Sequence, residues 1–209
     1  MSIITISRQY ASRGSEVAEH VARRLGWQLY DNSVVDTVAA RLGITPAEVS
    51  AREERRPSMA ERLASAITLS APEMMPTVGD PATSLSEERL VEMTSRVMQE
   101  AVQAGPAVIV GRGAQCLLAS RTDALHVFCY APMEALVAHA VEKLGVRRED
   151  AHRTVTEMNE QRDDYVKRHW KREWRDLANY HLCVNTAWLG TEGAAELIVQ
   201  VARERFGMA

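Results

Sequence analysis

Ile3-Ile4-Thr5-Ile6-Ser7 is the stretch on which the fold prediction depends, because it is a short apolar run rich in β-branched residues. Such a run is typical of a buried strand. The loop Arg8-Gln9-Tyr10-Ala11-Ser12-Arg13-Gly14-Ser15 follows, and from residue 16 to 25 apolar residues recur at helical spacing. A strand, a small-residue loop and a helix in this order direct free backbone N–H groups and a positive helix end toward a phosphate. The loop does not spell the usual P-loop pattern G-x-x-x-x-G-K-[ST], so whether it holds a nucleotide phosphate is the main question.

The size and composition of the chain are those of an ordinary globular protein. Its 209 residues suffice for one α/β core, alone or with a small lid. Hydrophobic residues make up 46% of the sequence and charged residues 25%, and the net charge is −3. This balance gives no global reason to expect DNA or a membrane surface as a partner. We expect one domain over residues 1–209 and leave the oligomeric state open.

The three cysteines lie far apart in apolar surroundings, without the spacing of a zinc site: Cys116, Cys129 and Cys183. We interpret them as small buried hydrophobic residues of a protein in a reducing compartment. The N-terminal sequence shows no charged segment followed by a long apolar stretch, and no run approaches the ~20 apolar residues of a membrane helix. These observations predict a cytoplasmic location and no membrane partner.

Further apolar runs alternate with helical patterns along the chain. Strands are expected at residues 27–30, 107–110, 125–130 and 182–186. Helices are expected at residues 34–42, from 45 onward, and at 84–104, 133–144, 149–175 and 190–206. Asn32 or Ser33 is expected to cap the first of these helices. Apolar strands separated by helices predict a parallel sheet covered on both faces, with the ligand site at the carboxyl ends of the strands.

Residues 57–83 form the least regular part of the sequence. A short helix is expected at residues 59–69, and three prolines and a glycine after it disfavour regular structure. This segment is either a mobile loop within a substrate-side insertion or a plain surface loop.

A basic segment lies between residues 162 and 175, where six Lys or Arg residues accompany three acidic ones. Arg168 and Arg172 are four residues apart, so in a continuous helix they would share a face. Such a face could close over a polyphosphate and neutralise the charge that develops on a transferred phosphoryl group. It could equally be a solvated helix with internal ion pairs, and contact with a nucleic acid is the weakest alternative. Trp170 and Trp174 are expected to pack this segment onto the body.

Two charged residues directly follow predicted strands. Arg112 lies between Gly111 and Gly113, where an arginine suits bidentate phosphate binding; the alternative is an exposed arginine in a glycine-rich turn. Asp31 could help hold Mg²⁺, accept a sugar hydroxyl or simply cap the following helix.

Several motifs along the chain resemble those of the cytidylate-kinase-like family. They are Ile4–Tyr10, Tyr30-Asp31, Val108–Gly113, Val127–Pro132 and Asn179–Thr186, and they occur in order over nearly the whole chain. The family is similar to bacterial cytidylate kinases, which are P-loop nucleoside monophosphate kinases. The resemblance therefore implies a three-layer α/β fold with a five-stranded parallel sheet, a helical substrate-side insertion and a basic lid.

The resemblance also implies roles for individual residues. Residues 45–100 would contain the insertion, and residues 149–176 would form the lid. ATP would bind at the loop through Arg8, Ser12, Arg13, Gly14 and Ser15, with Ser15 also near the position that holds Mg²⁺. The acceptor, a nucleotide or another small molecule, would lie near Asp31 and Arg112. The residues that would clamp the transferring phosphate and act in catalysis are Arg162, Arg168 and Arg172, with Lys167 beside them.

The sequence departs from cytidylate kinases at positions that carry chemistry. Arg8 and Arg13 stand at the two P-loop glycine positions, Gly14 stands at the lysine position, and Gly113 replaces an acidic residue after Gly-Arg. One of the two arginines could substitute for the lysine, since a guanidinium also pairs with phosphate oxygens, or a bulky arginine could block the loop. Two hypotheses follow: an ATP-dependent phosphotransferase, or a catalytically weak or inactive nucleotide-binding regulatory protein on the same fold.

Overall fold

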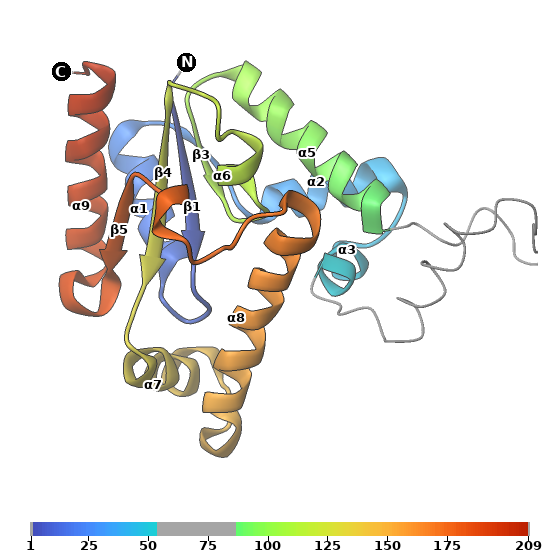
Figure 1. Cartoon of the computed structure of the whole chain (residues 1–209), viewed down its shortest axis with the longest axis vertical. Helices are drawn as coiled ribbons and strands as arrows, with labels where there is room; N and C mark the ends of the chain where they lie inside the picture. The colour runs from blue at the N-terminus through green and yellow to red at the C-terminus, as the bar shows by residue number, and fades with distance from the viewer. Residues whose placement is uncertain (1, 54–86, 209) are drawn as a thin grey trace, which may run out of the picture.

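The computed structural model describes residues 2–53 and 87–208, and its five strands form one parallel sheet (Figure 1). The strands are β1 (Ile3–Arg8), β2 (Gln28–Tyr30), β3 (Ala107–Val110), β4 (Ala124–Tyr130) and β5 (Leu182–Asn185). Their order is β2-β3-β1-β4-β5, so β1 is central, and its Ile6 lies in register with Val110 of β3 and Val127 of β4. The predicted parallel sheet and its five strands are confirmed.

Helices cover both faces of this sheet. The helices are α1 (Gly14–Leu25), α2 (Asn32–Leu42), α3 (Pro46–Glu53), α5 (Glu87–Ala104), α6 (Ala114–Leu117), α7 (Met133–Leu144), α8 (Arg148–Trp170) and α9 (Thr186–Phe206), with a short 3-10 helix, η1 (Leu177–Asn179). Helices α1 and α9 pack on one face, and α2, α5 and α6 pack on the other. The strands point toward the end of the molecule where α7 and α8 lie (Figure 1).

The central strand explains why the sequence has no alternation of apolar and polar residues. Ile4 and Ile6 belong to the core on the α1 and α9 side, whereas Ile3 belongs to the core on the α2 and α5 side. All three are 0% exposed, and burying such a side chain contributes about 1.5–3 kcal/mol. Because both faces are covered, each position of the strand has to be compatible with burial.

A polar pair is buried in the sheet, formed by Thr5 of β1 and His126 of β4. Thr5 Oγ1 shares a 2.8 Å hydrogen bond with Nδ1 of His126 on β4, and the His126 ring stacks on His181 with centroids 4.9 Å apart. Burial and the neighbouring His181 lower the pKa of His126 to about 4. His126 is therefore neutral at pH 7 and forms part of the core.

Helix α8 ends earlier than its charged pattern predicts. Lys171 adopts a left-handed conformation (φ 55°) and terminates the helix, so the expected continuation to residue 175 is wrong, and Arg172 does not share a helical face with Arg168. The chain turns here because Trp174 is buried: its backbone N–H donates to Asp163 Oδ1 at 3.1 Å, and its ring meets Phe128 edge-on at 5.3 Å. The packing predicted for Trp174 is confirmed, although the residue lies outside the helix.

Other helix boundaries differ from expectation by a few residues. Helix α2 begins at Asn32 with Asp31 at the N-cap position, so Asn32 or Ser33 as the cap is wrong. The start of α3 is confirmed, since Thr45 and Glu48 exchange hydrogen bonds of 2.8 Å and 3.2 Å. Helix α9 begins four residues before the expected Gly190, where it is kinked. The predicted helix at 59–69 and the start of the one at 84–104 lie outside the described residues.

The described cysteines are free thiols, as the sequence predicts. Cys129 is fully buried as predicted, whereas Cys116 and Cys183 are only partly buried. Burial raises the pKa of Cys129 to about 12 and that of Cys116 to about 11. Both thiols are therefore protonated at neutral pH and behave as hydrophobic residues. None of the helices in the described part of the chain combines the length and the apolar character required to cross a membrane.

Candidate active site

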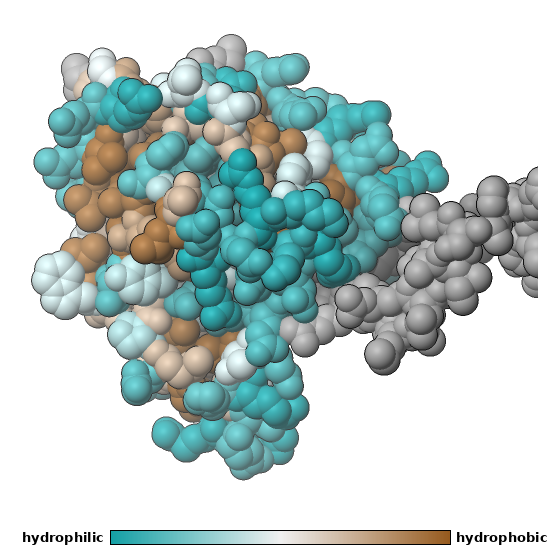
Figure 2. All heavy atoms as spheres, viewed as in Figure 1, coloured by the Kyte–Doolittle hydropathy of each residue, from teal (hydrophilic) through white to brown (hydrophobic). Residues whose placement is uncertain are grey.

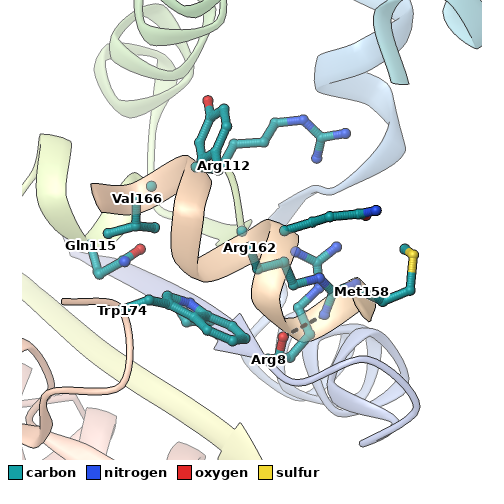
Figure 3. A pocket seen from close by; sticks show the side chains of 12 residues that line it. Arg8, Arg112, Gln115, Met158, Arg162, Val166 and Trp174 are labelled. Carbon is teal, nitrogen blue, oxygen red and sulfur yellow. Dashed lines mark hydrogen bonds between the residues drawn. The ribbon is translucent and has the colours of Figure 1, made fainter. Parts of the chain in front are cut away.

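A pocket of about 110 Å³ lies at the carboxyl ends of β1 and β3, against one face of α8 (Figure 3). Its walls include Ser7 and Arg8 at the end of β1, and residues 111–113 and Gln115 after β3. The other lining residues are Met158, Gln161, Arg162, Tyr165, Val166 and Trp174. Ligands of parallel α/β folds bind at this edge of the sheet, so the pocket is the candidate site.

Three arginines from three different elements meet in this pocket. Nη1 of Arg162 donates a 2.5 Å hydrogen bond to the backbone oxygen of Arg8, and Nη1 of Arg112 donates a 3.5 Å hydrogen bond to the backbone oxygen of Asp31. Nη2 of Arg8 lies 3.4 Å from Oδ1 of Asp31. Among the described residues that line the pocket are these three arginines and no Asp or Glu. Such a partly enclosed cationic pocket favours an anionic ligand.

Asp31 faces this site rather than its own helix. It occupies the N-cap position of α2, but its carboxylate makes no capping hydrogen bond to that helix. The carboxylate instead pairs with Arg8, and both side chains are mostly buried, with 15% and 19% of their surfaces exposed. Of the alternatives for Asp31, capping is therefore not supported, and it remains a candidate substrate-binding residue beside Arg8 and Arg112.

The turn 111–113 is built so that Arg112 can reach the pocket. All three residues have positive φ values: 73° at Gly111, 52° at Arg112 and 70° at Gly113. A Cβ atom on Gly111 would lie 3.0 Å from Cζ of Arg8, and one on Gly113 would lie 2.8 Å from Cε2 of Trp170. At Gly113 the added atom would meet the rigid indole ring, so this position requires glycine. At Gly111 it would meet only the flexible end of Arg8, and glycine is favoured there by the positive φ. The indole of Trp170 fills the space in which an acidic side chain would begin, which explains the departure at Gly113.

In the loop 8–15, a large arginine stands where a standard P-loop has a glycine, and a glycine stands where it has the lysine. A Cβ on Gly14 would lie 3.0 Å from Cγ of Arg8 and 3.2 Å from Cβ of Cys129, so the arginine stem occupies the space beside the position of the usual lysine. Ala11 and Arg13 are both left-handed, with φ values of 63° and 61°. These are conformations that glycine adopts without strain and other residues adopt at a cost of about 1–2 kcal/mol.

Arg13 points away from the pocket. Its guanidinium forms a two-pronged ion pair with Glu16, with Nη2 at 2.7 Å and Nε at 3.1 Å from Oε2, and 43% of its side chain is exposed. The hydrogen bonds from Arg13 lower the pKa of Glu16. Of the two arginines at P-loop glycine positions, Arg8 lines the pocket and Arg13 does not.

The beginning of α1 fits a phosphate group. No side chain caps this helix within the described part of the chain, and its N-cap residue is Arg13. The first-turn N–H groups, including that of Ser15, have no partner within an α-helix and carry its positive dipole end. ATP with Mg²⁺ suits this arrangement, because Mg²⁺ is commonly held by phosphates and one or two protein oxygens. The described residues contain no cluster of three His, Cys, Asp or Glu that could hold a metal by itself.

Helix α8 contacts the loop 8–15 directly. Oδ1 of Asn159 accepts a 2.7 Å hydrogen bond from the backbone N–H of Tyr10, and the Arg162 guanidinium lies 5.9 Å from the centre of the Tyr10 ring. On the other side of the loop, Oγ1 of Thr186 donates a 2.7 Å hydrogen bond to the backbone oxygen of Ser12. Helix α8 and Thr186 at the start of α9 therefore both bind the backbone of the loop.

The remaining basic residues of the predicted clamp lie outside the pocket. Arg168 pairs with Glu87 at 2.5 Å, Lys167 pairs with Glu173 at 2.7 Å, and Arg172 donates a 3.2 Å hydrogen bond to Oδ1 of Asn179. The end of α8 and the turn that follows form a strongly hydrophilic surface (Figure 2). Of these contacts, only that between Lys167 and Glu173 is an ion pair within the segment, since Arg168 pairs with Glu87 of α5. Only Arg162 of the three predicted clamp residues lines the pocket.

Several pocket residues were not among the sequence predictions. Those on α8 are Met158, Gln161, Tyr165 and Val166, and together with the predicted Arg162 they define one helical face by their spacing of three and four residues. This face can be recognised in the sequence from the spacing of its residues, although the charged residues of the segment alone do not reveal it. Gln115 carried no signal, because its role depends on the turn at 111–113 that precedes α6.

Comparisons with known proteins define first the class and then the family. The structure superposes on shikimate kinase from Acinetobacter baumannii in complex with shikimate with a TM-score of 0.52 and 14% identity, covering 98% of this chain and 94% of that chain. For shikimate kinase from Bacteroides thetaiotaomicron the TM-score is 0.51 at 13% identity, covering 99% and 98%. An uncharacterized protein from Eubacterium ventriosum gives a TM-score of 0.69 at 17% identity, covering 97% and 98%. The chain therefore has the fold of the P-loop kinases.

Residues 3–187 match the model of the Cytidylate kinase-like family, and the chain belongs to that family. The family resemblance predicted from the sequence is thus confirmed. Comparison with curated proteins gives no match.

Proposed function

We propose that the protein is an ATP-dependent phosphotransferase whose acceptor is a small anionic molecule, with nucleoside monophosphates as the first candidates. The observation that carries this proposal is the convergence of Arg8, Arg112 and Arg162 in a pocket beside the loop 8–15. Guanidinium groups pair with phosphate and carboxylate oxygens and offset the charge that develops during phosphoryl transfer. Membership of the Cytidylate kinase-like family supports a nucleotide acceptor, and the fold shared with shikimate kinases makes a carboxylate acceptor worth testing.

The residues have distinct proposed roles. The first turn of α1, with Ser12, Gly14 and Ser15, would hold the phosphates of ATP, and Ser15 would provide an oxygen for Mg²⁺. When bound, the metal would neutralise phosphate charge. Arg8 would supply the cation that the missing P-loop lysine provides elsewhere, because it lies in the pocket.

On the acceptor side, Asp31 and Arg112 would position the acceptor and Arg162 would act on the transferring group. Arg168 and Arg172 could join the clamp only if their contacts with Glu87 and Asn179 were exchanged for contacts with a ligand. Positioning and electrostatics dominate this chemistry, so the site does not require a strong general base.

A coupled assay tests the proposal, with Mg²⁺–ATP and a panel of CMP, UMP, AMP, GMP and shikimate. We expect turnover with at least one acceptor, and its loss in Arg8→Gly, which restores the consensus glycine but removes the cation. Circular dichroism and a thermal melt establish that each protein is folded. Absence of turnover with every acceptor, in protein shown to be folded, would reject the phosphotransferase.

The contact between α8 and the loop 8–15 favours a second candidate, a nucleotide-binding regulatory protein without turnover. Its basis is that Asn159 and Arg162 of α8 already bind the backbone of the loop, at Tyr10 and Arg8. In this case ATP or a monophosphate raises the melting temperature although no acceptor is phosphorylated. No shift with any nucleotide would rule out this candidate as well.

A further inference from the structure

The end of the pocket away from Arg8 and Arg162 contains buried amide and indole groups. Gln115 of α6 is 1% exposed and lies in the wall beside Val166 and Trp174 (Figure 3). Within the part of the chain that the structure describes, its Nε2 has no hydrogen-bond partner. Buried polar groups are almost always hydrogen-bonded, so an unpartnered amide donor on a residue that lines a pocket favours a ligand that supplies the partner.

A second unpartnered atom lines the same pocket. Oε1 of Gln161, on the α8 face that lines it, is buried and makes no hydrogen bond to any described residue. Gln115 therefore offers a donor, and Gln161 offers an acceptor. A donor and an acceptor on two different elements of the pocket wall provide two polar atoms whose hydrogen bonds a ligand can supply.

The wall around these amides is aromatic and apolar. Trp174 is 3% exposed, and Val166 is also 3% exposed. This combination suits a flat ring whose faces contact apolar side chains and whose edge carries polar atoms.

Arg112 and Gln115 are linked by a short segment of the chain whose conformation is fixed. Gln115 comes three residues after Arg112, and the turn between them is fixed by Gly111 and Gly113. The backbone N–H of Ala114 also donates to the oxygen of Gly111 at 3.0 Å. Arg112 and Gln115 are therefore held at fixed positions in the same pocket wall.

We propose that Gln115 and Gln161 form the specificity subsite of the acceptor pocket and recognise a neutral ring edge that carries a hydrogen-bond acceptor and a hydrogen-bond donor. This inference rests on the proposed function, since it treats the pocket as the acceptor side. A nucleobase edge and the hydroxyl groups of a ring carboxylate both have this chemistry. The anionic group of either ligand lies with the arginines, and the ring lies against Trp174.

The variant Gln115→Met separates ligand recognition from a structural role, because it keeps the length of the side chain and removes its polar atoms. Without ligand, we expect its melting temperature to equal or exceed that of the wild type, since an unsatisfied buried donor is removed. Titration calorimetry without ATP then compares the affinities for CMP, UMP, AMP, GMP and shikimate with the affinity for inorganic phosphate. We expect at least a tenfold loss of affinity for the ring-bearing ligand that the wild type prefers, and less than a twofold change for inorganic phosphate.

Gln103→Met is the matched control, since Gln103 is exposed on α5. It should change neither the melting temperature nor any affinity. If Gln115→Met loses affinity for a nucleotide, the recognised ring edge is that of a nucleobase. If it loses affinity for shikimate, the recognised groups are the hydroxyls of a ring carboxylate.

Two results would overturn the inference. One is an equal loss of affinity for inorganic phosphate and for the ring-bearing ligand, or a lower melting temperature of Gln115→Met, because Gln115 would then support the structure of the pocket. The other is a wild-type protein that binds none of the ring-bearing ligands more tightly than inorganic phosphate. Because these measurements omit ATP, they are independent of the turnover on which the proposed function depends.

Discussion

The loop 8–15 and the turn 111–113 are two strand-end segments of the same sheet, and both carry an arginine. In the turn, glycines flank Arg112 because Arg8 and Trp170 fill the space where side chains would stand. In the loop, the left-handed positions are occupied by Ala11 and Arg13, and the side chain of Arg13 is engaged by Glu16. Both segments hold non-glycine residues in left-handed conformations, Arg112 in the turn and Ala11 and Arg13 in the loop. The two segments differ in packing, because the turn is surrounded closely and its arginine lines the pocket, whereas Arg13 of the loop lies outside it.

The acceptor side and the phosphate-binding side of the proposed site therefore depend on different interactions. Arg112 is held by close contacts of the residues around it, so it depends on tertiary packing. The phosphate-binding part depends on the N-terminus of α1, where Arg13 is the uncapped N-cap residue. Changes in the turn should therefore act mainly on stability and acceptor binding, and changes at Arg13 should have small effects.

The largest effect is expected from Gly113→Ala. The added Cβ would lie 2.8 Å and 2.9 Å from ring atoms of Trp170 at a φ of 70°, so we expect a loss of about 4 kcal/mol in the free energy of unfolding. Gly145→Ala is the control, since Gly145 has nearly the same φ, 71°, and no atom within 4 Å of the added Cβ. It should lose only about 1 kcal/mol. Urea denaturation measures both, and equal losses would show that the contact with Trp170 does not determine the turn.

The next effect concerns β1, the strand that leads into the loop. Burial holds the pKa of His126, the partner of Thr5, at about 4, whereas the unfolded value is near 6.5. The unfolded chain therefore binds more protons between these values, and the stability present above pH 6.5 is lost as the pH falls toward 4. The expected loss is about 3 kcal/mol.

Urea denaturation at a series of pH values measures this loss, and the variant His126→Gln should show a flatter profile between pH 6.5 and 4. Parallel profiles for the two proteins would mean that other groups cause the acid sensitivity.

A third effect concerns acceptor binding by the turn. Arg112→Lys keeps the positive charge but removes the planar fork, so kcat/KM for the acceptor should fall about 100-fold, or about 2.7 kcal/mol. The KM for ATP should change less than threefold, since Arg112 lies on the β3 side of the pocket. Arg147→Lys, at a side chain that is 72% exposed, should leave both constants unchanged. A larger change in the KM for ATP than for the acceptor would place Arg112 at the donor side.

The sequence contains enough information for the sheet, because its four longer strands are short runs rich in apolar or β-branched residues that alternate with helical patterns. It also places Asp31 and Arg112 at strand ends, and the structure brings them together with Arg8 and Arg162.

The fate of the charged segment 162–175 could not be predicted in the same way. Its charges continue past Trp170, but the helix ends where Trp174 enters its own packing site against Phe128, which is distant in sequence. The direction of Arg13 and the burial of Gln115 also depend on contacts that no local pattern encodes. Local patterns therefore identify the edge of the sheet that carries the site, and tertiary packing selects which of its charged side chains enter the pocket.

The smallest effect is expected from Arg13→Gly, which tests whether the loop arginine is a phosphate ligand or only a surface group. The change removes an exposed ion pair worth about 0–1 kcal/mol and relieves a left-handed conformation that costs about 1–2 kcal/mol, so the net change in stability should stay near 1 kcal/mol or less. Ala11→Gly relieves a similar φ without loss of charge and is the matched control. Because Glu16 engages Arg13 outside the pocket, the rise in melting temperature with Mg²⁺–ATP should equal that of the wild type. A smaller rise in Arg13→Gly alone would identify Arg13 as a phosphate ligand, and a larger one would show that its side chain obstructs the loop.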